Sequence, residues 1–199
     1  MNEFDKKALY LKNPLGDNSM ARYLWPSYLD TRESIYNLLD AEHCEQNLIS
    51  EVNWADRKKY TGSREFGIPV KVGDICYIDY GQAYLNEIGY QHFGLIVSIT
   101  EGKMFVVPMT SNTVQYAKAY DPVSNPTGRK HLMRLGQIGE MNKPSVLFLN
   151  DVKYLNTSRV IRKVAHMDTR RELFWSVKTR VLETIFNKEA EMFEVVHTA

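Results

Sequence analysis

Residues 70–80 read VKVGDICYIDY and give the clearest indication of how this chain folds. Their core, Asp74–Tyr80, is short and rich in β-branched and aromatic residues, which is typical of a strand buried in a sheet. Two similar runs follow at Phe93–Ile99 and Met104–Val107. The three residues between them, Glu101-Gly102-Lys103, have the composition of a hairpin turn. We therefore expect an antiparallel sheet to begin here.

Two further strands are predicted at His131–Leu135 and Ser145–Leu149, and a helix is predicted near the end of the chain. The helix starts with a capping-box pattern at Thr169 and Glu172. One apolar stripe follows at spacings of three and four, made of Leu173, Phe174, Val177, Val181, Leu182, Ile185 and Phe186. Because no helix-length segment separates the strands, an antiparallel barrel or sandwich is favoured over a parallel sheet.

The N-terminal third has a different character. Apolar residues recur at roughly helical spacing over Asp30–Lys59, which predicts one or two helices. The residues before Asp30 mix aromatics with turn formers and predict an irregular arm or one short helix. Residues 60–67 (YTGSREFG) have the composition of a linker. We therefore divide the chain into a helical extension, 1–66, and a barrel domain with a C-terminal helix, 67–199.

The composition is that of an ordinary globular protein, with 44% hydrophobic and 25% charged residues. No apolar run approaches the roughly 20 residues that span a bilayer, so we expect a cytoplasmic protein without a membrane segment. Cys44 and Cys76 are expected to be buried free thiols rather than a disulfide. The five histidines lack metal-ligand spacing, and we expect neither a metal nor another cofactor.

Charge is distributed unevenly along the chain. Residues 129–180 contain twelve of the 25 lysines and arginines and four of the 24 acidic residues, which leaves 13 basic and 20 acidic residues elsewhere. A basic segment beside an acidic remainder suggests a polyanionic partner, although a solvated charged face gives the same pattern. Within the segment, Arg159 fits a structural ion pair with Asp79 or Asp151 better than a role in a site.

Four blocks, in order and at sensible spacing, resemble the MazF/PemK family of toxins. Residues 70–80 are similar to that family's opening strand with its GDI motif, and Phe93–Ser98 to its second strand. Phe105–Asn112 (FVVPMTSN) resembles the third strand and its P-[IL]-T-S turn. Ser145–Val160 is similar to the block before the C-terminal helix. The likeness covers roughly Val70–Phe186.

The resemblance implies a mainly β fold with flanking helices (α+β): a small SH3-like antiparallel barrel with a C-terminal helix, usually a homodimer. It also implies a metal-independent endoribonuclease that acts on single-stranded RNA and is held in check by a cognate antitoxin protein. In such chemistry the ribose 2′-hydroxyl attacks the adjacent phosphate. The reaction needs a base, an acid for the leaving 5′-oxygen, and donors for the developing charge.

The catalytic residues that the resemblance implies are His92, Thr110 and Ser111. His92 stands where the family has an arginine, and Phe93 stands where the family has a proline. A histidine can serve as acid or base near neutral pH, but it lacks the permanent charge and five donors of arginine. Thr110 and Ser111 match the hydroxyl residues at the end of the family's third strand. Hydroxyls at strand ends also form hydrogen bonds with nearby backbone.

Five further residues are candidates for contacting RNA. Arg129, Lys130 and His131 begin a predicted strand, and basic side chains there would suit phosphate groups. Tyr84 and Tyr90, in and after the long loop at 81–89, would suit stacking on unpaired bases.

Three functions are compatible with this sequence. The leading one is the ribonuclease toxin described above. A second is a poison of DNA gyrase related to CcdB, for which Phe193, Val195 and Val196 near the C-terminus provide apolar residues. A third is a non-catalytic RNA-binding or regulatory relative, which the missing arginine and the N-terminal extension favour. The fold alone does not separate these functions.

Overall fold

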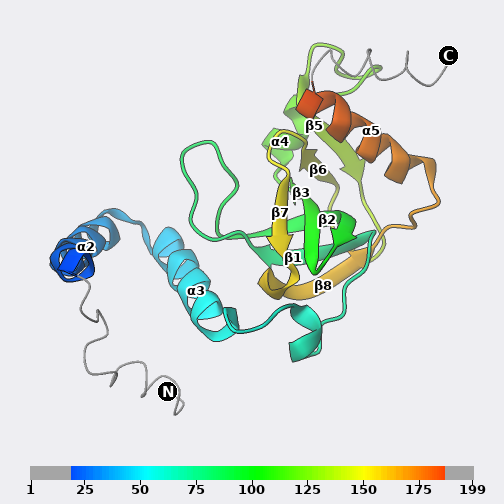
Figure 1. Cartoon of the computed structure of the whole chain (residues 1–199). Coiled ribbons are helices and arrows are strands. Elements are labelled where there is room, and N and C mark those ends of the chain that lie inside the picture. Colours follow the sequence, from blue (N-terminus) through cyan, green and yellow to red (C-terminus); the bar gives the residue numbers. More distant parts are fainter. Residues whose placement is uncertain (1–18, 187–199) are drawn as a thin grey trace. The chain divides into compact units, whose positions relative to one another are not determined.

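A computed structural model of this chain describes residues 19–186 (Figure 1). The chain divides into two compact units between Glu45 and Gln46. This junction lies inside helix α3 (Ala41–Arg57), so the last three turns of α3 belong with the sheet. The division after residue 66 that the sequence suggests remains a prediction. No helix between residues 19 and 186 has both the length and the hydropathy to cross a membrane.

The first unit contains α2 (Ser19–Leu38) and the start of α3. One or two helices were expected over Asp30–Lys59, but α2 begins eleven residues before Asp30 and includes Pro26. A proline removes only one helical hydrogen bond, and side chains reinforce the turns that follow. The Arg32 guanidinium donates to the hydroxyl of Tyr28 at 2.8 Å and to that of Tyr36 at 3.0 Å, four residues to either side.

Eight strands in the second unit form a single sheet with the order β4-β5-β6-β3-β2-β1-β8, and β7 also pairs with β3. The strands predicted from sequence are all present. Their bounds are β1 (Asp74–Asp79), β2 (Gln91–Thr100), β3 (Lys103–Thr110), β4 (Ala119–Tyr120), β5 (Arg129–Gly136), β6 (Ser145–Phe148), β7 (Lys153–Asn156) and β8 (Val160–His166). The helical elements are η1 (Ser63–Phe66), α4 (Thr113–Lys118), η2 (Thr157–Arg159) and α5 (Glu172–Phe186).

The α+β fold class is confirmed, but the prediction of a closed antiparallel barrel is wrong in two respects. The sheet is open, because the strands at its two ends, β4 and β8, do not pair with each other. It is also mixed, because β4 runs parallel to β5. The physical reason lies in β4, which is only two residues long. A strand of that length cannot supply the ladder of hydrogen bonds that would close the sheet.

The predicted hairpin turn between β2 and β3 is confirmed. Thr100 pairs with Lys103, and the two residues between them have positive φ, 48° at Glu101 and 77° at Gly102. Two consecutive left-handed residues define the turn type whose twist matches a β-hairpin. This tight connection fixes the register of β2 against β3, on which the candidate site depends.

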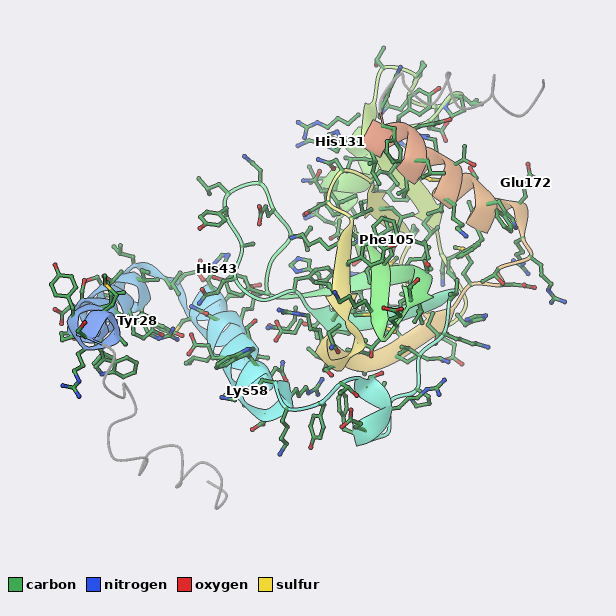
Figure 2. The ribbon with its side chains drawn as sticks, in the orientation of Figure 1. Tyr28, His43, Lys58, Phe105, His131 and Glu172 are labelled. Atoms are coloured by element: carbon green, nitrogen blue, oxygen red, sulfur yellow. The ribbon has the colours of Figure 1, made fainter. Side chains whose placement is uncertain are left out.

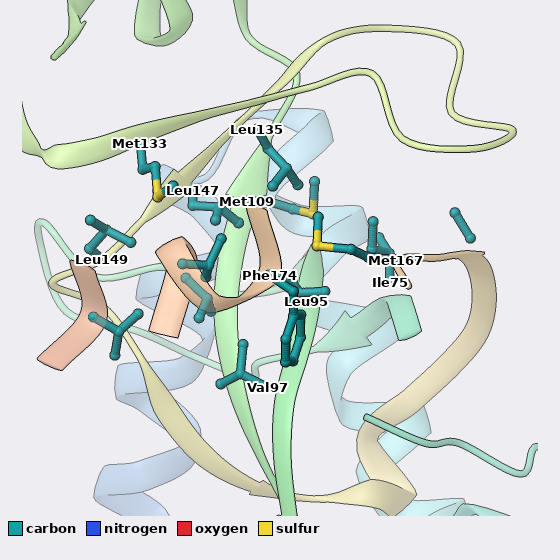
Figure 3. Close-up of a cluster of buried hydrophobic side chains, with 14 of the residues drawn as sticks. Ile75, Leu95, Val97, Met109, Met133, Leu135, Leu147, Leu149, Met167 and Phe174 are labelled. Atoms are coloured by element: carbon teal, nitrogen blue, oxygen red, sulfur yellow. The ribbon is translucent and has the colours of Figure 1, made fainter. Parts of the chain in front are cut away.

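One face of the sheet, which we call the α5 face, packs against helix α5 (Figure 3). Phe174, Val177 and Val181 of α5 are 2%, 0% and 2% exposed, and they cover strand residues such as Leu95 and Met109. Leu182, Ile185 and Phe186 of the predicted apolar stripe remain exposed instead. The helix also begins at Glu172, two residues later than a cap at Thr169 would place it.

The opposite face carries a second apolar cluster, formed by Cys76, Ile78, Tyr80, Ile96, Met104, Val106 and Val160. Both cysteines are free thiols, as expected, although Cys44 is only half-buried. Burial raises the pKa of the Cys76 thiol to about 12, and the charge of Asp74 acts in the same direction. Cys76 is therefore an inert core residue.

The part of α3 in the second unit is held by a buried polar network at the end of β1. The Asp79 carboxylate accepts hydrogen bonds from the hydroxyl of Ser50 at 2.6 Å and from the side-chain amide of Gln91 at 3.3 Å. Arg159 donates to the backbone oxygen of Asp79 at 3.2 Å. The predicted ion pair of Arg159 is therefore wrong, because the Asp79 carboxylate faces Ser50 and Gln91.

We expect a Ser50→Ala substitution to lower the free energy of unfolding by about 1.5–3 kcal/mol, the usual contribution of a hydrogen bond to a charged group. Ser50 is 5% exposed and Asp79 is 4% exposed, so water cannot replace the lost donor. Urea denaturation followed by circular dichroism measures the change. Ser176→Ala, on the exposed side of α5, is the matched control and should stay within about 0.5 kcal/mol of wild type. Equal effects of the two substitutions would contradict the role of this network.

Candidate active site

His92 and Thr110 lie on neighbouring strands near the same end of the sheet. Phe93 of β2 pairs with Met109 of β3, and the register extended by one residue sets His92 opposite Thr110. Phe93 and Met109 belong to the α5 face. Because side chains alternate along a strand, those of His92 and Thr110 share the opposite face. A register that continues by this one residue would place the two Cβ atoms about 4.5–5.5 Å apart.

The hydrogen bonding of His92 determines which of its nitrogens is free. Nδ1 lies 2.8 Å from the backbone oxygen of Gly89. A carbonyl oxygen only accepts, so Nδ1 carries a hydrogen and Nε2 of the neutral ring has the lone pair. Burial lowers the pKa of His92, while the Gly89 hydrogen bond and the charge of Asp151 oppose this shift. At neutral pH the half-buried ring is therefore uncharged and has the form of a general base.

The loop residues that hold His92 are themselves fixed by Asp151 and Lys153. The Asp151 carboxylate accepts a hydrogen bond from the backbone N–H of Ile88. Lys153 donates to the backbone oxygen of Ile88 at 2.9 Å, and its ammonium lies 3.3 Å from the Asp151 carboxylate. These contacts fix the end of the 81–89 loop, whose last residue, Gly89, bonds to His92. Asp151 and Lys153 are therefore positioning residues that act on His92 through the backbone.

We expect an Asp151→Asn substitution to lower the pKa of His92 further, because the carboxylate charge favours the protonated ring. NMR titration of the His92 ring protons measures this shift, which a purely structural role of Asp151 would not produce. Glu140→Gln removes one exposed negative charge from the 137–144 loop and is the matched control. An unchanged His92 pKa in Asp151→Asn would contradict the proposed coupling.

Thr110 ends β3, and its hydroxyl oxygen accepts a hydrogen bond from the backbone N–H of Asn112 at 3.2 Å. The Asn112 side chain in turn caps α4 by accepting from the backbone N–H groups of Val114 and Gln115. The expected bond to nearby backbone is thus present, yet the hydroxyl hydrogen of Thr110 is left to donate. Ser111 follows as a half-buried residue just beyond the strand.

The loop from Gly81 to Gly89 leads into the site from β1. It is closed at its base by two backbone hydrogen bonds that involve Tyr90, from Tyr90 N–H to Gly81 O at 2.6 Å and from Tyr80 N–H to Tyr90 O at 2.7 Å. Tyr90 is half-buried, whereas Tyr84 is 86% exposed. Of the two tyrosines, Tyr84 is the one whose ring is accessible for stacking on a base.

The structure does not bring the basic trio Arg129, Lys130 and His131 to His92. His131 shares the α5 face with Met133, two residues along β5. A cavity of about 510 Å³ there is lined by Lys130, His131 and residues of α5, and Figure 2 shows His131 beside α5. Burial, aided by the charge of Arg129, lowers the pKa of His131. Lys130 and His131 therefore belong to a separate surface beside α5.

A cation that the sequence did not single out occupies the same face as His92 and Thr110. Val146 of β6 pairs with Thr110 on one side and with Arg134 of β5 on the other. The Arg134 guanidinium donates to the Ser124 hydroxyl at 2.7 Å and lies 3.9 Å from the Asp121 carboxylate. In the sequence, Arg134 directly follows Met133 on a strand, so the two side chains lie on opposite faces. This pattern places Arg134 near the site only when the order of the strands is known.

The solved structures to which this chain is similar include three structures of MazF toxins. MazF (Form-I) from Deinococcus radiodurans has a TM-score of 0.43 and 14% identity, over 59% of this chain and 96% of that chain. The Mycobacterium tuberculosis toxin MazF-mt6 has a TM-score of 0.35 and 13% identity, over 57% of this chain and 93% of that chain. The MazE-MazF structure (Form-II) from Deinococcus radiodurans has a TM-score of 0.35 and 12% identity, over 65% of this chain and 97% of that chain. No protein-family model matches the sequence, and no curated protein does. At this level of likeness, the function must be inferred from the site residues themselves.

Proposed function

We propose that this chain is an endoribonuclease toxin that cleaves single-stranded RNA without a metal ion, through attack of the ribose 2′-hydroxyl. The observation that carries the proposal is a neutral His92, with the Nε2 lone pair unblocked, set opposite Thr110 on one face of the sheet. Among residues 19–186, Nε2 has no hydrogen-bond partner that would compete with a substrate hydroxyl.

Each site residue has a role in this reaction. His92 Nε2 accepts the proton of the 2′-hydroxyl as the oxygen attacks phosphorus, and the leaving 5′-oxygen takes a proton from water. The Thr110 hydroxyl donates to a phosphate oxygen as negative charge develops there. Arg134, whose charge the Asp121 carboxylate partly balances, is the cation on the same face in the absence of the family arginine, and Ser111 is a second hydroxyl at the strand end. Tyr84 offers its exposed ring to an unpaired base.

The partners in this proposal follow from the sequence resemblance: single-stranded RNA, a cognate antitoxin protein and a second copy of the chain. The gyrase alternative depends on Phe193, Val195 and Val196, which lie outside the described residues. Among residues 19–186 no group of three or more His, Cys, Asp or Glu side chains is placed to hold a metal ion.

Cleavage of a mixed-sequence, end-labelled RNA in EDTA tests the proposal. We expect the wild-type protein to cut the RNA and Thr110→Ala to cut it about 10²–10³ times more slowly, the usual loss for one donor to developing charge. Thr100→Ala, at the other end of the same hairpin, is the matched control and should match wild type. An intact RNA that the wild-type protein binds would instead support the non-catalytic RNA-binding function.

The pH dependence of cleavage gives a separate prediction. The base must be unprotonated, and burial lowers the pKa of His92 below its ordinary 6.5. The rate should therefore be constant near pH 7 and fall on acidification, with its midpoint below 6.5. Thr110→Ala should lower the cleavage rate and leave the midpoint pH unchanged. A midpoint above 6.5 would contradict the role of His92 as the base.

A further inference from the structure

A second cavity lies within the Gln46–Ala199 unit, between the C-terminal half of α3 and the end of β1. Its volume is about 220 Å³, and its lining includes Trp54 and Arg57 of α3, Lys58 just after the helix, and Asp79 and Arg159. Because α3 precedes the region that resembles the toxin family, this cavity depends on a segment that the resemblance does not explain.

Three cations converge on this cavity, and a single carboxylate faces them. Arg57, Lys58 and Arg159 form no ion pair with any residue between 19 and 186. Asp79 is the only acidic residue in the lining. One of its carboxylate oxygens already accepts from Ser50, Gln91 and the backbone of Gly81. The cavity therefore has a positive charge that favours an anion.

Several hydrogen-bond donors in the lining also lack acceptors. Arg57 donates from one terminal nitrogen to the backbone oxygens of Ser158 and Val160. Arg159 likewise uses one nitrogen, toward Asp79 O, and each guanidinium has five N–H donors. The side-chain nitrogen of Asn53 is buried without any hydrogen-bond partner in the described part of the chain. An anion with several oxygens would satisfy these donors.

An aromatic ring stands beside the cations. Trp54 is 62% exposed, and the Lys58 ammonium lies 4.5 Å from the centre of its ring. Figure 2 labels Lys58 at the C-terminal end of α3. An exposed indole next to a cation suits a planar base joined to an anionic group, because bases stack on aromatic rings while their phosphates contact lysine and arginine.

We propose that this cavity binds a nucleotide, with its phosphate among Arg57, Lys58 and Arg159 and its base against Trp54. The nucleotide is either free or one residue of an RNA strand, since both present the same phosphate and base. The proposal does not depend on cleavage by His92.

Fluorescence of Trp54 in the full-length chain tests the proposal. Trp25→Phe and Trp175→Phe leave Trp54 as the single tryptophan, and both replaced side chains are exposed. We expect adenosine 5′-monophosphate to quench Trp54 with saturation. Lys58→Met combined with Arg159→Met should weaken that binding at least about tenfold. Lys71→Met combined with Lys143→Met removes two exposed cations elsewhere and should leave the affinity unchanged.

Two further arms identify the source of the nucleotide. A short single-stranded RNA that quenches Trp54 and competes with the mononucleotide indicates an RNA strand, and quenching by the mononucleotide alone indicates a free nucleotide. His92→Ala should leave either result unchanged. Quenching by neither probe, or equal binding by the Lys58/Arg159 and Lys71/Lys143 double variants when thermal melts show that both are folded, would overturn the proposal.

Discussion

A His92→Ala variant is expected to cleave single-stranded RNA about 10²–10⁴ times more slowly than wild type, the usual contribution of a positioned general base. The half-buried ring presents Nε2 as an acceptor because Nδ1 bonds to Gly89 O at 2.8 Å. Alanine removes that acceptor, and no other titratable side chain is set opposite Thr110 in the register of β2 and β3. Single-turnover cleavage rates in EDTA measure the loss.

His131→Ala is the matched control for this prediction. His131 is also a half-buried histidine with a lowered pKa, but it lies on the α5 face. Its removal should change the single-turnover rate less than about twofold. The corresponding change in activation free energy is well below that of a one-unit pKa shift. A larger loss in His131→Ala than in His92→Ala would place the chemistry beside α5 and contradict the site described above.

A Phe174→Ala variant is expected to lose about 3–5 kcal/mol of unfolding free energy, the range for a buried phenylalanine cut back to alanine. Phe174 is 2% exposed and lies within the largest apolar cluster, where it joins α5 to the sheet (Figure 3). Its ring is enclosed by strand residues, so the neighbours can only partly fill the cavity that alanine leaves. Equilibrium denaturation in urea gives the value.

Trp175→Ala, the next residue on α5, is the control for Phe174→Ala. Trp175 is 57% exposed, and we expect its removal to cost less than about 1 kcal/mol, as at most surface positions. Comparable losses from the two substitutions would mean that α5 does not pack as described.

Local sequence patterns predicted most of the sheet, because its strands are short and bounded by turns. The runs at 74–80, 93–99 and 104–107 became β1, β2 and β3, and the Glu101-Gly102 turn joined the last two. Strand β8 was not predicted, since VIRKVAH mixes charged and apolar residues and its place beside β1 depends on distant pairing. The open end of the sheet was also not predictable, because closure depends on partners rather than on local propensity.

The candidate site was predictable where strand register decides proximity. The position of His92 opposite Thr110 was inferred from two strands joined by a tight turn, because the turn fixes the register of those strands. His131 appeared to belong with them in sequence, but alternation along β5 puts it on the other face. Arg134 and the Asp151–Lys153 pair could not be found from spacing, since they reach the site through strand order and a loop contact.

The most direct test of the account is the chemistry of the RNA ends that the wild-type protein leaves in EDTA. Attack by the 2′-hydroxyl forms a bond from O2′ to phosphorus and breaks the bond to O5′. Mass spectrometry of the fragments should therefore find a 2′,3′-cyclic phosphate and a 5′-hydroxyl. A single 2′-deoxy residue at the cut position should block that cut. Cleavage that persists at the deoxy residue, or RNA that stays uncut, would contradict the account.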